Sequence, residues 1–162
     1  MNPSLTLWYD TPAKNWNEAL PVSNGRLGAM VFGGAQRERL QLNEETLWSG
    51  HPRDRDNPDA PRYLAQLRAA AFKGDYALAD QLARKMQGPF TQSYLPLGDL
   101  HFAFEHTGEI TDYRRPLDLD EAVAVVEYSV DGATFTRRVF ASAPDGAIVA
   151  RLTRSRPGTL TF

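Results

Sequence analysis

Residues 18–50 read EALPVSNGRLGAMVFGGAQRERLQLNEETLWSG, and the rest of the chain is organised around this stretch. Its first half carries an Asn-Gly pair at Asn24, then apolar residues that stop at the glycine pair Gly33-Gly34. A turn signal followed by a short apolar run predicts a β-strand over residues 26–32. Residues 37–42 predict a second strand, and residues 33–36 can turn between the two because glycine adopts positive φ at little cost.

Polar residues replace this pattern after Leu42. Asn43 and Glu44 open a segment that is rich in polar and charged groups, and Trp48 is the aromatic residue near its start. We expect a loop from Asn43 to Asp59, since polar and proline-containing segments between periodic ones form loops. A tryptophan on such a loop can stack on a sugar ring, pack against another domain, or cover the core of its own domain, and all three alternatives stay open.

Two helices are predicted between Pro61 and Gln87. Pro61 suits the first turn of a helix, and apolar residues then recur at helical spacing through about Phe72. Gly74 ends this helix, and Asp75 can cap the second one. The helices therefore interrupt a series of strands.

From residue 98 onward the pattern is that of β-structure. Asp131-Gly132 is the strongest hairpin signal in the sequence, and we expect residues 122–130 to pair with residues 133–141. Alternation places Phe135 and Val139 on one face of the second arm together with Arg137. Further strands are expected over residues 5–9, 100–104, 147–153 and 160–162.

Length, charge and cysteine content restrict the classes of protein. The chain has 162 residues, a net charge of −2 and no cysteine, so it suits one domain without disulfides. The near balance of charge indicates neither nucleic acid nor an anionic membrane as a partner. No apolar run approaches the roughly 20 residues of a membrane helix, and the start lacks the parts of a signal peptide. As given, the sequence predicts a cytoplasmic protein, or a periplasmic or secreted one if the start is mis-assigned.

The ordered series of motifs resembles glycoside hydrolase family 95, the α-L-fucosidases, at the N-terminal end of those proteins. The family pattern reads roughly EALPIGNGRLGAMVFGG and then ERIQLNEDTLWSG. This chain departs from it in small ways, such as Ser23 in place of glycine. The other agreeing segments are 56–60 (DNPDA), 96–100 (PLGDL), 113–115 (YRR), 117–119 (LDL) and 139–144 (VFASAP).

The resemblance implies a mainly β fold, an antiparallel β-sandwich of the super-sandwich type with a short two-helix insertion. Residues 1–162 would be the N-terminal β-sandwich domain of a longer glycoside hydrolase, truncated at its C-terminal end. The expected strand at residues 160–162 agrees with truncation, because a strand at the chain end still needs ladder partners.

The full-length protein would be an inverting α-L-fucosidase that removes terminal α-L-fucosyl residues, typically 1,2-linked, from glycans. Its partners would be a fucosylated glycan and a C-terminal (α/α)6 catalytic barrel that is missing here, with no cofactor, nucleic acid or membrane. The alternative is a free-standing carbohydrate-binding module or a purely structural sandwich.

No catalytic residue is assigned within the chain. Inverting glycosidases use an acid and a base roughly 6.5–9.5 Å apart, whereas the adjacent Glu44 and Glu45 point apart in an extended segment. Glu105, like Glu44 and Glu45, is expected to be structural or solvated, as most surface acids are. If the chain alone hydrolysed a fucoside, the catalytic acids would be sought among these three residues and Asp99. The three histidines lack metal-ligand spacing, so no metal site is expected. The catalytic groups implied by the resemblance belong to the barrel.

Five polar or aromatic residues are candidates for contact with the substrate or with a neighbouring domain. For each there is also a structural interpretation, such as an Asn-Gly turn, an ion pair, or packing of the indole. The candidates are Asn24, Arg26, Asn43, Glu44 and Trp48.

Two groups of residues are expected to play no part in a site. Trp8 and Trp16 are predicted to lie in the core or at an edge, because tryptophan is usually largely buried. The arginines near the C-terminal end are predicted to lie on a solvated face. They are Arg137, Arg138, Arg151, Arg154 and Arg156.

Overall fold

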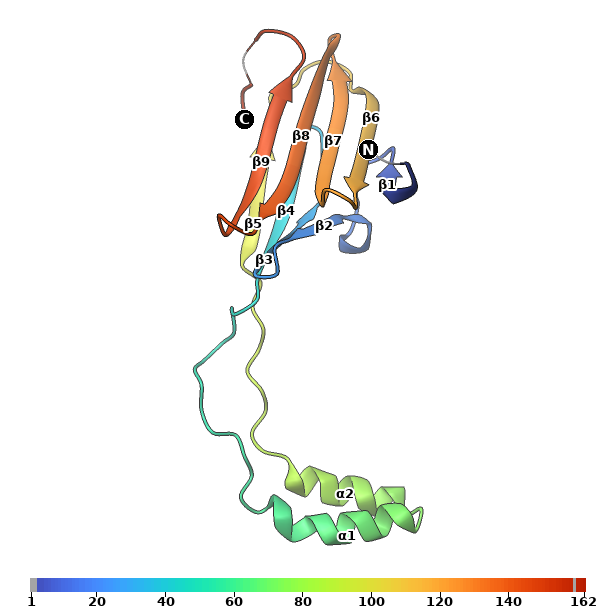
Figure 1. The fold of residues 1–162 in the computed structure, drawn as a ribbon, viewed down its shortest axis with the longest axis vertical. Coiled ribbons are helices and arrows are strands. Elements are labelled where there is room, and N and C mark those ends of the chain that lie inside the picture. Colours follow the sequence, from blue (N-terminus) through green and yellow to red (C-terminus); the bar gives the residue numbers. More distant parts are fainter. Residues whose placement is uncertain (1–2, 159) are drawn as a thin grey trace. The chain divides into compact units, whose positions relative to one another are not determined.

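A computed structural model describes residues 3–158 and 160–162 (Figure 1). The chain divides into two compact units. We call Met1–Leu47 together with Pro96–Phe162 the sandwich unit, and Trp48–Leu95 the helical unit. The fold is mainly β with an inserted pair of helices, which confirms the fold class predicted from the sequence.

Among the described residues, one sheet of the sandwich unit has five antiparallel strands and the other has four. The larger sheet contains, in pairing order, β1 (Thr6–Tyr9), β6 (Thr111–Asp118), β7 (Val123–Val130), β8 (Ala133–Ser142) and β9 (Ala147–Arg154). The smaller sheet contains β2 (Leu20–Ser23), β3 (Leu27–Val31), β4 (Arg37–Glu44) and β5 (Gly98–Ala103). Short 3-10 turns precede β1 and β2, at Pro3–Leu5 and Trp16–Glu18.

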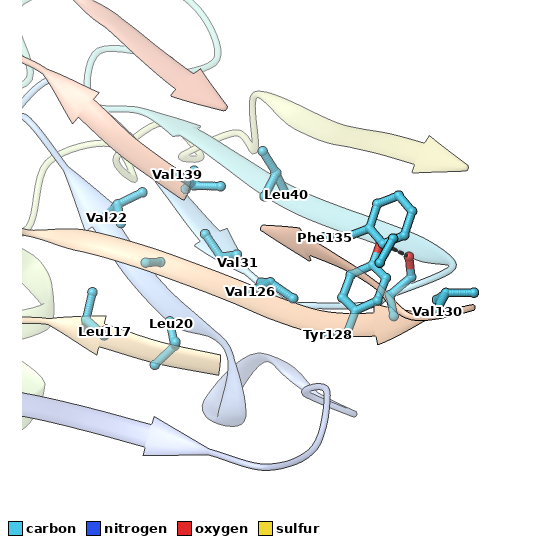
Figure 2. Close-up of a cluster of buried hydrophobic side chains, with 14 residues drawn as sticks. Leu20, Val22, Val31, Leu40, Leu117, Val126, Tyr128, Val130, Phe135 and Val139 are labelled. Carbon is cyan, nitrogen blue, oxygen red and sulfur yellow. Dashed lines mark hydrogen bonds between the residues drawn. The ribbon is translucent and has the colours of Figure 1, made fainter. Parts of the chain in front are cut away.

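Apolar side chains of both sheets meet in one core (Figure 2). Val31 and Leu40 of the smaller sheet and Val126 and Val139 of the larger sheet are almost completely buried. Full burial of such a side chain stabilises the fold by roughly 1.5–3 kcal/mol. The alternation of buried and half-exposed residues along β8 confirms the face predicted for Phe135. The core therefore fixes how the two sheets face each other.

The predicted Asp-Gly hairpin is confirmed. Val130 pairs with Ala133 across the turn, and the ladder continues to the pair Ala124 and Val139. Asp131 has φ 50° and Gly132 has φ 71°, which is the double positive φ of a type I′ turn.

Two strands were not predicted, and one predicted strand is wrong. Both β2 and β6 contain a proline, Pro21 and Pro116, which weakens a strand signal because proline cannot donate to the ladder. Residues 160–162 form no strand. Leu160 instead packs against the core, and the Phe162 ring lies 5.8 Å from the Phe102 ring, so apolar packing decides the path of this segment.

The helical unit contains α1 (Ala60–Phe72) and α2 (Tyr76–Met86), close to the predicted bounds. Asp75 caps α2, because its Oδ1 accepts a hydrogen bond of 3.1 Å from the Leu78 amide. Gly74 between the helices has φ 79°, as predicted for a glycine that ends a helix. Within the described ranges, no helix is long and apolar enough to cross a membrane.

Candidate functional site

The turn at Gly33-Gly34 is held by side chains from both sheets. Arg137 of β8 donates to the Gly34 carbonyl at 2.9 Å, and Tyr128 of β7 donates to the Ala35 carbonyl at 3.1 Å. Glu38 of β4 accepts from the Gly33 amide at 2.8 Å. We call this set of contacts the inter-sheet clasp. It satisfies backbone groups that would otherwise be buried without partners.

Close packing explains why glycine occupies both positions of this turn. A Cβ atom on Gly33 would lie 2.2 Å from Cδ of Arg115, and a Cβ atom on Gly34 would lie 1.8 Å from the Arg37 carbonyl oxygen. Gly33 also has φ 81°, a conformation that other residues adopt only with strain. The glycine pair of the sequence motif therefore serves the packing of the sandwich.

The clasp contains a buried ion pair between Glu38 and Arg137, whose side chains are 0% and 2% exposed. Burial raises the pKa of the Glu38 carboxyl, against the opposing effect of the Arg137 guanidinium. The prediction that Arg137 lies on a solvated face is wrong. Alternation along β8 turns its side chain inward, and β4 supplies a carboxylate opposite it.

His106 extends this polar region. Its Nε2 atom lies 2.7 Å from the hydroxyl of Tyr128, which also bonds the clasp. Partial burial lowers the pKa of the His106 imidazole, and the nearby guanidinium groups of Arg137 and Arg154 lower it further. The folded protein therefore favours the neutral imidazole.

Asn24 organises the Asn-Gly turn between β2 and β3. Its Oδ1 accepts hydrogen bonds from the amides of Arg26 at 3.1 Å and Leu27 at 2.8 Å. Its Nδ2 donates to the carbonyl of Ser142 at 2.8 Å, which ties the turn to the end of β8. These bonds engage both ends of the Asn24 amide in the sandwich unit.

Arg26 and Glu44 come together beside this turn. Arg26 Nε lies 2.9 Å from Glu44 Oε1, and the Arg26 side chain is well exposed. Hydrogen bonds from Thr46 and then from Arg26 lower the pKa of the Glu44 carboxyl. Asn43, the neighbouring residue on β4, is exposed and pairs with Gly28 of β3. Four of the five candidate residues thus gather near one end of the four-stranded sheet.

Trp48, the fifth candidate, belongs to the helical unit and is 50% exposed. Its ring lies 5.0 Å from that of Tyr94 in an edge-on arrangement. The adjacent residues Ser49 and Ser93 are joined by a 2.8 Å backbone hydrogen bond. Tyr94 was not predicted from the sequence. Pairing of β4 with β5 could have indicated it, because the segment that leaves β4 carries Trp48 and the segment that enters β5 carries Tyr94.

Trp8 and Trp16 are each 58% exposed, so neither lies in the core. The edge alternative of the prediction holds for Trp8, because β1 is an edge strand of the five-stranded sheet. Trp8 stands on β1 with the Arg114 guanidinium 5.4 Å from the centre of its ring. Trp16 lies in the 3-10 turn before β2. Neither position could be deduced locally, because exposure depends on which face of a sheet or turn the fold covers.

Two of the acidic residues considered above, Asp99 and Glu44, are paired with different arginines. Asp99 lies 2.9 Å from Arg39, and Glu44 is paired with Arg26 as described above. Within residues 3–158 and 160–162, no group of three or more histidine or acidic side chains could hold a metal ion.

These features define a two-sheet β-sandwich with an inserted helix pair and a polar cluster at one sheet end. The chain belongs to the family described as glycosyl hydrolase family 65, N-terminal domain, whose model matches residues 7–162. The resemblance to the N-terminal domain of fucosidases, stated from the sequence, is confirmed by this family match and by relatives that are named as fucosidases.

Over 161 residues the chain is 42% identical to "Alpha-L-fucosidase 2" of Arabidopsis thaliana. This match covers 98% of the present chain and 19% of the relative. It is 33% identical over 158 residues to "Probable alpha-fucosidase A" of Aspergillus niger, covering 91% of this chain and 20% of the relative. The chain therefore spans about a fifth of the length of these curated relatives.

Proposed function

We propose that this chain is the N-terminal domain of a longer enzyme, an inverting α-L-fucosidase of glycoside hydrolase family 95. The observation that carries the proposal is the 42% identity to a protein named as an α-L-fucosidase, across nearly the whole chain. The enzyme would hydrolyse terminal α-L-fucosyl residues, typically 1,2-linked, and the acid and base would come from an (α/α)6 barrel beyond residue 162. The separate engagement of Asp99 and Glu44 supports a chain without its own catalytic pair.

In this proposal the helical unit supports the barrel. Phe72 of α1 is 91% exposed and Phe90, just after α2, is 93% exposed. Large contiguous patches of such side chains mark surfaces that contact another protein part, and the proposal requires these two rings to belong to one. Trp48 and Tyr94 add a second aromatic group to the same unit, and aromatic residues are enriched in interface centres.

Asn24, Arg26, Asn43 and Glu44 form a separate proposed contact surface, which lies on the sandwich unit. The Arg26 side chain is 68% exposed and offers N–H donors at the surface, suited to a hydroxyl-rich substrate or a polar domain edge. Glu44 holds this guanidinium in place, because its Oε1 accepts from Arg26 Nε. Asn24 would act by holding the turn that carries Arg26, because its side chain bonds the backbone there.

The test compares the longer gene product with the 162-residue chain. Both are assayed with an aryl α-L-fucoside and with 2′-fucosyllactose, and the first-formed anomer of fucose is read by proton NMR. We expect the longer protein to release β-L-fucose and the 162-residue chain to show no turnover. Release of α-L-fucose would overturn inversion, while turnover by the shorter chain would place the catalytic acids within it. An inactive longer protein that still binds the sugar would favour the binding-module alternative.

A further inference from the structure

A shallow hollow lies on the outer face of the five-stranded sheet, away from the core. Its volume is about 400 Å³, within the usual range of small-molecule sites. Strands β1, β6 and β7 supply most of its walls. The residues that line it are Pro3, Thr6, Trp8, Arg114, Pro116, Val125 and Glu127.

The floor and one wall of the hollow are apolar. Val125 is buried, although it lies on the face of β7 opposite the core residues Ala124 and Val126. Trp8 pairs with Pro116 across β1 and β6, and its indole is 58% exposed. An exposed indole next to a buried valine offers a flat apolar surface on which a small ring can lie.

The remaining side chains are polar and nearly balanced in charge. Arg114 lies directly opposite Glu127 in the ladder between β6 and β7, so a cationic donor and an anionic acceptor stand side by side. The Arg114 guanidinium lies 5.4 Å from the Trp8 ring centre. One positive and one negative group favour a neutral ligand over an ion, because neither charge dominates the hollow.

We propose that this hollow binds one pyranose ring of a neutral glycan. A pyranose has an apolar C–H face that suits the Trp8 indole, and hydroxyl groups that can accept from Arg114 and donate to Glu127. All three side chains come from adjacent strands of one sheet, which holds them rigidly in place.

The three tryptophans of the chain allow a direct test. Each indole N–H gives its own NMR signal, and single replacements of Trp8, Trp16 and Trp48 by phenylalanine assign them. The probes are L-fucose, D-galactose and lactose, a choice that rests on the proposed function. We expect the Trp8 signal to shift on titration with a Kd on the order of 1 mM, as is usual for so small a ligand.

Variants with matched controls locate the binding. Trp8→Ala and Arg114→Gln should each weaken binding about tenfold, since each removes one wall or one hydrogen-bonding group. Trp16→Ala is the control, because Trp16 is equally exposed and lies elsewhere in the sandwich unit. Loss of affinity in Trp16→Ala but not in Trp8→Ala would overturn the proposal. So would an unchanged Trp8 signal at about 100 mM sugar, where a site of this affinity is saturated.

The same question can be put to the longer protein, independently of how the 162-residue chain behaves. Hydroxyl-radical footprinting should oxidise Trp8 without sugar, and D-galactose should protect Trp8 more than the equally exposed Trp16, because free sugar also scavenges radicals. A Trp8 that resists oxidation without sugar would mean that other parts of the protein cover the hollow, and the proposal would fail. Neither readout depends on fucoside hydrolysis. The proposed enzymatic function can therefore fail while sugar binding at Trp8 is confirmed, and sugar binding can fail while the enzymatic function is confirmed.

Discussion

The sandwich unit and the helical unit differ in how much of their own apolar surface they bury. The buried core, with Val31, Val126 and Val139 at its centre, lies within the sandwich unit. In the helical unit, Ala70 is the buried residue of α1 and Leu82 that of α2.

This difference separates local from tertiary determinants of structure. The helices have good local signals, such as the Asp75 cap, yet helices of 13 and 11 residues are marginal without tertiary packing. The sandwich has weaker local signals in β2 and β6, and its stability comes from packing between the sheets. The predictions below test this contrast, beginning with the largest expected effect.

Removing one partner of the clasp should have the largest effect. Arg137→Leu leaves the Glu38 carboxylate buried without its counter-ion, which costs about 3–5 kcal/mol of unfolding free energy. Urea unfolding followed by tryptophan fluorescence measures the loss. Arg138→Leu is the matched control, since its pair with Glu121 is exposed and contributes at most about 1 kcal/mol. Equal losses in the two variants would contradict a structural role for the clasp.

The hairpin of the sandwich should be the next most sensitive position. Gly132→Val forces a β-branched residue to φ 71°, and we expect a loss of about 1–3 kcal/mol in urea unfolding. Gly28→Ala is the control. A Cβ atom there would meet its nearest neighbour at an ordinary 3.7 Å, without positive φ. A Gly132→Val protein as stable as the parent would mean that this turn does not constrain the sheet.

A cap deletion should affect the helical unit alone. Asp75→Ala removes the bond to the Leu78 amide and should destabilise α2 by about 1 kcal/mol. In the longer gene product, where residues 60–86 are expected to be protected, hydrogen exchange should quicken in residues 76–86 and stay unchanged in residues 123–141. Asp59→Ala is the control, because Asp59 precedes α1 without a side-chain cap bond. If exchange also quickened in the β7–β8 hairpin, the two units would unfold together and the contrast would fail.

Replacing His106 should have the smallest effect on stability, and this effect should appear as a change in how stability depends on pH. The imidazole pKa is lowered in the folded protein, so the unfolded chain takes up this proton first as pH falls. The stability linked to His106 is therefore complete above its ordinary pKa of 6.5 and is lost as pH falls toward the lowered value. We expect stability to fall less in His106→Asn than in the parent between pH 6.5 and that value. The raised pKa of Glu38 makes its own contribution to stability increase as pH falls. Because Glu38 is present in both proteins, this contribution cancels in the comparison.

Features set by neighbouring residues could be predicted from the sequence, and features set by distant partners could not. The Asp131-Gly132 turn and the Asp75 cap need only residues a few positions apart, and both were predicted. The partner of Arg137 is Glu38 in the other sheet, so burial of this arginine could not be deduced locally.

The candidate site was predicted in part for the same reason. The motif residues Asn24, Arg26 and Glu44 lie together because two adjacent strands bring them together. The exposure of Trp8 and the contact between Trp48 and Tyr94 depend on the path of the whole chain.

Hydrogen exchange of α1 and α2 in two proteins tests the central claim most directly. The sandwich unit has its own buried core, and under the proposed function the helical unit would be stabilised by further parts of a longer protein. In the 162-residue chain, residues 60–86 should exchange rapidly while residues 123–141 are strongly protected. In the longer gene product, residues 60–86 should become protected as well. Strong protection of residues 60–86 already in the 162-residue chain, unchanged in the longer protein, would show that the helical unit is stable without further parts of the protein.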